Sequence, residues 1–333
     1  MIIGLTYNSL PEDDSRFKTD EFVEFDDMNT INAIKNAIES GGHKVILVEA
    51  NENAYKKLKN SNLDFVFNFA EGLHGESRES QIPAMLEMLK IPYTGSGPST
   101  LAIALDKART KEILRYHGIP TPNFQVFRSV NEKLDKNLNF PLFIKPISEG
   151  SSKGITGKSL VHNEKEVRKT VDFIINNYHQ PALIEEFLDG REFTASILGN
   201  NPPKILPIVE IIFDNLPDDV PKFDCYEVKW IFDAPDSDIE TVVCPAKISK
   251  KLETRIKKVA LDTFKVLGCK DFCRIDIRLD KNNMPNVLEV NPIAGLIPDP
   301  KENSRFPKAC YAAGMTFNEI ILSILDAAIK RYS

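Results

Sequence analysis

Residues 273–291 constrain the fold of this chain most strongly, because they predict a β-hairpin with one polar face. Two alternating apolar runs flank Lys281-Asn282-Asn283, the pattern of two antiparallel strands joined by a turn. Side chains alternate between the faces of a strand, so one face should carry a defined polar set: Arg274, Asp276, Arg278, Glu289 and Asn291.

This polar face is suited to a divalent cation. Asp276, Glu289 and Asn291 offer carboxylate and amide oxygens, which Mg²⁺ prefers together with phosphate oxygens, and Arg274 stands beside them. The alternative is an ordinary amphipathic hairpin whose polar face meets water. Such a face more often carries Lys and Thr than two acids, an Asn and an Arg. The hairpin therefore predicts a site for Mg²⁺ carrying a polyphosphate.

The composition limits the class of protein. With 333 residues the chain is long enough for two or three domains. A net charge of -6 without a basic stripe argues against nucleic acid as a partner. The apolar runs are too short to span a membrane, and the N-terminus lacks the basic region of a signal peptide. Five cysteines without C-x-x-C spacing predict reduced thiols in a cytoplasm.

Residues 1–95 predict a parallel, Rossmann-like α/β domain. Strands are expected at 2–7, 45–48 and 63–69, and helices at 30–42 and 79–89; this β-α-β rhythm favours a parallel sheet. The polar segment 8–27 would then cross the strand ends, where open α/β sheets bind ligands. Directly after the third strand, Glu71 and His74 lie in a glycine-flanked loop. That loop is either part of a site or a plain turn.

Residues 96–180 predict a domain with a phosphate-binding loop. A strand at 139–146 contains Lys145 and leads into the small and glycine residues of 148–154. Backbone N–H groups of such a loop can close over phosphate oxygens, and Lys145 adds a positive charge. Loops of this composition are usually plain connectors. Here a further strand, expected at 155–160, makes it a hairpin lid. Helices are expected at 101–117 and 164–178.

Residues 181–333 supply the rest of the expected site. A strand at 182–188 contains Glu185 and exposes backbone groups that could bind an adenine, and Glu192 could accept a ribose hydroxyl; equally, both are ordinary acids of a sheet. The segment 214–238 is rich in Pro and Asp and is expected to form a long loop over the site. Helices are expected at 252–267 and 317–329.

The order of these motifs resembles that of the ATP-grasp superfamily and, within it, of the D-alanine–D-alanine ligase family. The resemblance implies three α/β domains in the ATP-grasp arrangement, here 1–95, 96–180 and 181–333, with ATP between the second and third. The matching motifs span almost the whole chain: Glu71-Gly-Leu-His-Gly75, Leu105-Asp-Lys107, Phe143-Ile-Lys145-Pro146, Glu149-Gly-Ser-Ser152, residues 184–194, Arg274-Ile-Asp276, Leu288-Glu-Val-Asn291 and Ser304-Arg-Phe-Pro307.

The resemblance also implies roles for individual residues. Those that would bind ATP are Lys107, Lys145, Glu149, Ser151, Ser152, Glu185, Glu186, Phe187, Leu188, Glu192 and Lys229. Two Mg²⁺ ions, with Mn²⁺ as a substitute, would bind Asp276, Glu289 and Asn291. The expected catalytic residues are Arg274, Gly295, Ser151, Glu71 and His74, and the expected substrate residues are Glu24, Ser304 and Arg305.

The implied reaction is ATP-dependent amide formation between two small amino acids through an acyl phosphate, with D-alanine the first expectation for each. A cytoplasmic homodimer acting in peptidoglycan synthesis is expected with it. The alternatives are a ligase for another amino acid or hydroxy acid pair, and a nucleotide-binding protein without ligase activity. The presence of Arg274 argues against the last, because binding ATP alone does not need it.

Four departures from the family pattern concern the substrates. The N-terminal Glu-x-x-Val-Ser motif, whose Glu holds the first ammonium group, is missing, and Glu24 is the candidate substitute. Trp230 stands where a Tyr is usual, and 296–303 is longer than expected. Ser304-Arg305-Phe-Pro resembles the Ser-Arg-Tyr-Pro of D-alanine–D-lactate ligases. Arg305 would either bind a substrate carboxylate or form a surface ion pair.

Overall fold

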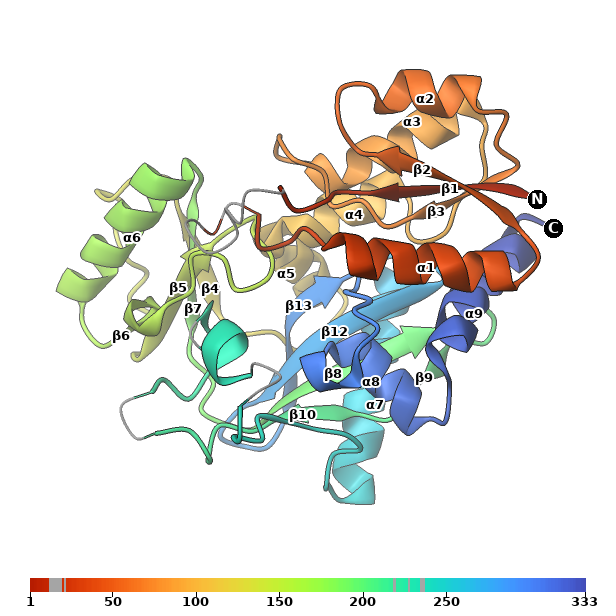
Figure 1. Cartoon of the computed structure of the whole chain (residues 1–333). Helices are drawn as coiled ribbons and strands as arrows, with labels where there is room; N and C mark the ends of the chain where they lie inside the picture. The colour runs from red at the N-terminus through yellow and green to blue at the C-terminus, as the bar shows by residue number, and fades with distance from the viewer. Residues whose placement is uncertain (12–19, 21, 218–219, 227, 234–236) are drawn as a thin grey trace.

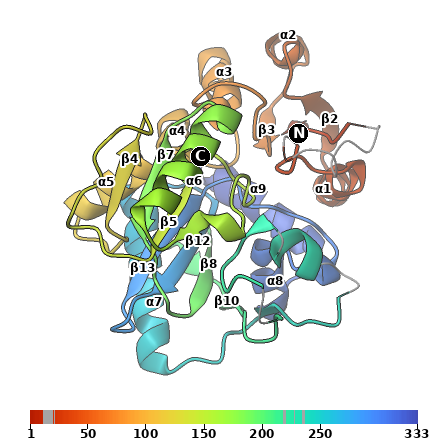
Figure 2. The ribbon, with the colours of Figure 1, turned by 90° about the vertical axis from the view of Figure 1, so that its left-hand side faces the viewer.

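The computed structural model describes residues 1–11, 20, 22–217, 220–226, 228–233 and 237–333. Three sheets organise this part of the chain, and they occupy three corners of the molecule (Figure 1). Figure 2 shows the same arrangement turned by 90°, with the N-terminal and middle sheets above the C-terminal one. The α/β class expected from the sequence is confirmed.

The N-terminal sheet is parallel and has the order β2-β1-β3, as the β-α-β rhythm predicted. Its strands are β1 (Ile2–Tyr7), β2 (Lys44–Glu49) and β3 (Phe65–Asn68), and its helices are α1 (Met28–Ser40), α2 (Ala54–Asn60) and α3 (Gln81–Leu89). Ile31, Ile34 and Ile38 form the buried stripe of α1, which lies on the opposite face of the sheet from α2 and α3 (Figure 1).

The middle sheet is antiparallel and has the order β4-β7-β5-β6. Its strands are β4 (Phe124–Phe127), β5 (Leu142–Pro146), β6 (Leu160–Val161) and β7 (Ala182–Glu186), and the helix α6 (Glu164–Tyr178) covers one face. The strand expected at 155–160 is wrong for 155–159, because residues 155–156 are irregular and Gly157–Ser159 is a 3₁₀ turn, and pairing with β5 begins only at Leu160, in β6.

The C-terminal sheet has the order β11-β10-β8-β12-β13, with β9 beside β8. Its strands are β8 (Glu192–Leu198), β9 (Lys204–Ile205), β10 (Val209–Ile211), β11 (Val242–Val243), β12 (Phe272–Leu279) and β13 (Pro285–Asn291). Helix α7 (Lys250–Val266) packs on one face, and α8 (Arg305–Ala312) and α9 (Phe317–Tyr332) pack on the other.

The predicted hairpin is confirmed, and it consists of β12 and β13. Arg274 pairs with Asn291 and Asp276 with Glu289, and the register shifts after Asp276. Ile275 and Ile277 are fully buried in the apolar cluster that contains α7. The polar side chains therefore lie on the face turned away from α7, toward the middle sheet.

By sheet membership the middle part of the chain extends further than the sequence indicated. The strand β7 pairs with β4 and β5, so the change to the C-terminal sheet lies between Glu186 and Glu192, whereas the expected boundary lay at residue 180. The division into 1–95, 96–180 and 181–333 stays a prediction. No single helix among the described residues is long and apolar enough to cross a membrane; α8 and α9 reach that length only as a bent pair.

The helix expected at 101–117 is two helices, α4 (Pro98–Leu105) and α5 (Lys107–Tyr116). Asp106 breaks the first helix by adopting an extended conformation, and its side chain caps α5 by accepting hydrogen bonds from the backbone N–H groups of Ala108 and Arg109 at 2.9 and 3.0 Å. A single periodic pattern cannot reveal such a cap, because the apolar stripe continues through it. The break places Lys107 at the start of α5.

Asp106→Ala is expected to lower the free energy of unfolding by about 1 kcal/mol, because both capping bonds are lost. The urea midpoint measures this. The control is Arg109→Ala, which removes an exposed side chain one turn away. Among the described residues this side chain forms an ion pair with Glu112, and its loss should leave the midpoint unchanged. A midpoint unaffected by Asp106→Ala would show that the cap contributes nothing.

Candidate functional site

The polar face of the hairpin carries a connected set of charged groups. Arg274 Nη2 lies 3.1 Å from Asp276 Oδ2, and Asn291 Nδ2 donates to the same oxygen at 3.0 Å. Thr194 of β8 donates to the other oxygen of Asp276 at 2.6 Å. Glu289 Oε1 lies 2.9 Å from the ammonium group of Lys107. Four of the five polar residues that the sequence placed on one face are thus together, with Asp276 opposite Glu289 in the strand register.

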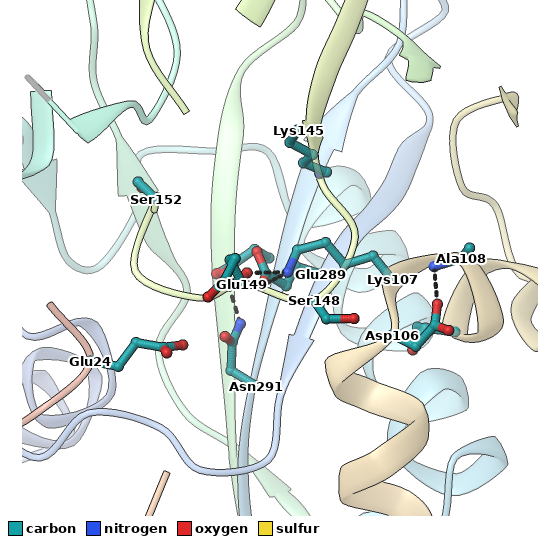
Figure 3. Close-up of polar contacts among 12 residues, drawn as sticks. Glu24, Asp106, Lys107, Ala108, Lys145, Ser148, Glu149, Ser152, Glu289 and Asn291 are labelled. Carbon is teal, nitrogen blue, oxygen red and sulfur yellow. Dashed lines mark hydrogen bonds and ion pairs between the residues drawn. The ribbon is translucent and has the colours of Figure 1, made fainter. Parts of the chain in front are cut away.

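Lys107 joins the hairpin to the glycine- and serine-rich loop. Its ammonium group donates a hydrogen bond to the carbonyl oxygen of Glu149 in addition to the ion pair with Glu289, and Figure 3 shows it lying between the two. The loop itself is sharply bent, because Ser151 and Ser152 have φ angles of +49° and +61°, a region that L-residues seldom adopt. Through Lys107 this loop lies against the polar face of the hairpin.

Lys145 is buried at the end of β5, where the Oε1 atom of Glu185 lies 2.8 Å from its ammonium group. Lys111 of α5, which sequence reasoning missed, lies 2.9 Å from the other oxygen of Glu185. Burial alone would raise the pKa of Glu185, but the two ammonium groups outweigh burial and lower it to about 2. Lys111 lies four residues after Lys107, so the shared helical face was a signal that could have identified it.

A small cavity of about 80 Å³ lies between the middle and C-terminal sheets. The ring of Phe187 stacks on Phe143 with centroids 6.2 Å apart, and Phe223 meets both rings edge-on. At its polar end Arg278 Nη1 lies 2.8 Å from Glu192 Oε2. The residues expected to bind the adenosine also line it: Glu185, Glu186, Phe187, Leu188 and Glu192. An aromatic slot with polar groups at one end fits a flat heterocycle.

A second cavity, of about 610 Å³, lies beside the first, and Glu149 and Glu289 line both. It brings together residues from all three parts of the chain. The expected site residues that line it are Glu24, Glu71, Lys107, Glu149, Ser151, Lys229, Arg274, Glu289, Asn291, Gly295, Ser304 and Arg305. The sizes and the shared wall suit a nucleotide site that opens into a site for small substrates.

Arg305 is buried and lies 2.9 Å from Asp224 through its Nη2 atom. The surface ion pair weighed for it is therefore wrong: the pair lies inside, and the Nε atom of Arg305 has no hydrogen-bond partner among the described residues. Ser304 donates to the carbonyl oxygen of Gly295 at 3.1 Å. Nearby, burial and the guanidinium group of Arg305 lower the pKa of Lys229 to about 8.

Two residues that the sequence predicted for the site lie at its edge or outside it. His74 is exposed and lines neither cavity. Glu186 lies at the edge of the small cavity, where it accepts hydrogen bonds from Asn123 and Asn139. The segment 296–303 contains a 3₁₀ turn, Pro300–Glu302, and its last residue, Asn303, donates to Asp233 at 2.7 Å. The side chain of Trp230 lies outside the described residues.

Sequence analysis also missed Arg78 and Glu79, which begin the segment before α3 and are both buried. Arg78 Nη2 lies 2.7 Å from Glu24 Oε2, and its Nη1 donates to the carbonyl oxygen of Ser148. Glu79 lines the large cavity beside Glu71. The helix expected at 79–89 began with Glu79 and left Arg78 outside, and the separation of 54 positions between Glu24 and Arg78 hides their contact from any local pattern.

Glu79 makes the stability depend on pH. Burial and then repulsion from Glu24 raise its pKa from 4.5 to about 8. Between these values the folded state binds more protons than the unfolded state, so stability falls as the pH rises. Glu79→Gln cannot ionise. We expect the variant to gain melting temperature over the parent at pH 9 and little at pH 5. An equal difference at both pH values would contradict this assignment.

The oxygen donors of the hairpin fit Mg²⁺. Asp276, Glu289 and Asn291 offer two carboxylates and one amide oxygen, which are hard ligands. Burial opposes ionisation of Glu289, but Lys107 and then Lys145 outweigh it and lower its pKa. Among the described residues no group of three His, Cys, Asp or Glu side chains could hold a metal ion. An ion at this hairpin would therefore need the amide oxygen and further oxygens from its ligand.

Comparison with known proteins gives the family. Residues 113–326 match the family model "D-ala D-ala ligase C-terminus". The uncharacterized protein y4sG of Sinorhizobium fredii is 36% identical over 304 residues, covering 89% of this chain and 86% of that protein. A D-alanine–D-alanine ligase of Pelotomaculum thermopropionicum is 34% identical over 313 residues, covering 91% and 92%. The D-alanine–D-alanine ligase of Bacillus anthracis complexed with ATP has the same fold, with a TM-score of 0.75 at 24% identity over 99% of this chain and 98% of that one. The protein belongs to the D-alanine–D-alanine ligase family, which has the ATP-grasp fold.

Proposed function

We propose that the protein is an ATP-dependent ligase that joins the carboxylate of one amino acid to the amino group of another, with D-alanine the first expectation for each. The observation that carries the proposal is the position of Lys107 and Glu289. They form an ion pair of 2.9 Å where the small aromatic cavity, which Glu289 also lines, meets the large cavity. Family membership supports the same reaction.

The reaction has two steps. A carboxylate oxygen of the first amino acid attacks the γ-phosphorus of ATP, the bond to the bridging oxygen breaks, and ADP leaves. The second amino group then attacks the acyl carbon, phosphate leaves with the electrons of the C–O bond, and the new amide nitrogen loses a proton. The chain contributes mainly positioning and opposite charge at the transferring group.

The charged residues divide this work. Lys107 and Lys145 would hold the phosphates beneath the loop 148–154, which excludes water from the acyl phosphate. Arg274, with a buried Nε atom that has no partner among the described residues, would bind the oxyanion that forms at the acyl carbon. Asp276, Glu289 and Asn291 would bind Mg²⁺, and two ions are expected. The bound Mg²⁺ would neutralise charge on the phosphate oxygens.

Phosphate release from ATP and Mg²⁺ in the presence of single and paired D- and L-amino acids tests the proposal. Release with D-alanine supports D-alanine ligation, and release only with other acceptors, including hydroxy acids, supports the alternative pair. Silence with every acceptor, together with tight ATP binding, would leave a nucleotide-binding protein and overturn the ligase. A homodimer in a cytoplasm is part of the proposal, and sedimentation of the purified chain tests the dimer.

A further inference from the structure

The large cavity ends at a wall of acidic groups. Glu24, Glu71 and Glu79 line it from the segment before α1 and from the loop after β3, next to the loop residues Gly150 and Ser151. The Glu24 carboxylate lies so close to Gly150 that a Cβ atom there would lie 2.2 Å from its Oε1 atom. This wall thus lies against the loop 148–154.

Two of these carboxylates have no partner. Glu24 pairs with Arg78, and Arg78 also faces Glu149 at 3.5 Å. In contrast, no hydrogen bond or ion pair joins the side chain of Glu71 or Glu79 to another described residue. Glu79 is only 9% exposed and lines the cavity. Burying a carboxylate without a partner costs stability. Glu79, with Glu71 beside it, would therefore be stabilised by binding a cation.

The two nearby cationic side chains, Arg78 and Lys107, are paired with other acids. Arg78 is held by Glu24 and Lys107 by Glu289, at 2.7 and 2.9 Å. The α-ammonium group of one amino acid would neutralise one of the two remaining carboxylates. A ligand with a single positive charge, such as alanine, would therefore leave the other acid without a cationic partner.

We propose, on the basis of the ligase function above but with the alternative substrate pair, that the amino acid activated by ATP is a diamino acid rather than D-alanine, with a second cationic nitrogen on its side chain. Glu71 and Glu79 hold its two amino groups, and its carboxylate lies toward Lys107 and Glu289. Burial and repulsion from Glu24 raise the pKa of Glu79. A raised carboxyl pKa is expected at a cation site that holds no cation. Bound diamino acid would return both carboxyl groups to the ionised form.

Kinetics with matched substrates test this proposal. Ornithine and norvaline differ in the terminal amino group, and so do lysine and norleucine; each is supplied as the D- and the L-form, with D-alanine as the acceptor. We expect kcat/KM for phosphate release to be at least about tenfold higher with the diamino acid than with its neutral partner. Equal values, or a preference for norvaline or alanine, would overturn the proposal and leave the ligase function standing.

A pair of variants locates the effect. Glu79→Gln should lower the ratio of kcat/KM for ornithine over norvaline by about tenfold or more. Glu76→Gln is the matched control, because Glu76 lies in the same loop but is exposed and lines neither cavity. It should leave the ratio unchanged. A ratio that Glu79→Gln does not alter, in a variant that melts like the parent at pH 5, contradicts the assignment.

Calorimetry separates this proposal from the ligase function. If no amino acid stimulates phosphate release from ATP, the ligase function fails. The affinities of the whole chain for ornithine and norvaline, measured with ADP and Mg²⁺, still test whether the site binds a diamino acid. Tighter binding of ornithine, lost in Glu79→Gln, would support a diamino acid site. Equal or undetectable binding of both would overturn it.

Discussion

Lys145→Ala is expected to lower kcat for ATP-dependent phosphate release by about 10²- to 10³-fold, the loss typical for one positioned electrostatic group. The chain should still fold, because Glu185 keeps its second partner, Lys111, at 2.9 Å. Only Lys111→Ala combined with Lys145→Ala would leave the Glu185 carboxylate buried without a cation, which costs about 3–5 kcal/mol. Kinetics and thermal melting of the single and double variants measure the two effects separately.

The matched control is Lys158→Ala, which removes an exposed lysine of the same part of the chain. It should retain both kcat and melting temperature. Full activity in Lys145→Ala would remove the phosphate-binding role of this lysine. Unfolding of the single variant would instead show that Lys145 acts mainly in stability.

Arg274→Ala should cost about as much in kcat, again about 10²- to 10³-fold, with a much smaller change in KM for ATP. The reason is that its guanidinium group lines the large cavity rather than the adenosine slot. Arg274→Lys keeps the charge but loses the planar fork, so it should recover only part of kcat. Steady-state kinetics measure both variants.

Arg128→Ala, at an exposed position, is the control and should behave like the parent. If Arg274→Ala raised KM for ATP and left kcat unchanged, the arginine would serve nucleotide binding rather than the chemical step.

The sequence predicted the hairpin well because its information is local. The two-residue alternation in 273–291 sets which side chains share a face, and the apolar half, including Ile275 and Ile277, packs on α7 as that alternation requires. Once one face is buried, a slip of one residue would bury Asp276 and Glu289. The register is therefore fixed by burial, and the metal set followed from the residues alone.

What the sequence missed depends on contacts between distant segments. The pairing of Glu24 with Arg78 joins residues that are 54 positions apart in the chain, and no periodicity reports it. Lys111 received no role from the sequence, yet it is 1% exposed, because the Glu185 carboxylate offsets the cost of burying its charge. The two cavities are lined through such long-range contacts, which is why the fold was easier to predict than the details of the candidate site.

Arg305 also has a partner that the sequence did not predict. The motif Ser304-Arg305 suggested a residue near a substrate carboxylate, and the arginine lines the large cavity. No pattern in the sequence indicated that Asp224, 81 positions earlier, would be its partner at 2.9 Å. Its cation is therefore partly satisfied before any substrate arrives.

Binding of Mn²⁺ with ADP tests most directly the claim that the hairpin holds a metal–nucleotide complex. Mn²⁺ is paramagnetic, so its bound and free forms are counted by electron paramagnetic resonance without any turnover. We expect the parent chain to bind Mn²⁺ more tightly when ADP is present, and Glu289→Gln to weaken that binding at least about tenfold, since one of two carboxylate ligands is lost. Glu164→Gln, on the exposed face of α6, should bind as the parent does. Equal Mn²⁺ affinity in Glu289→Gln and the parent would contradict the metal site at β12 and β13.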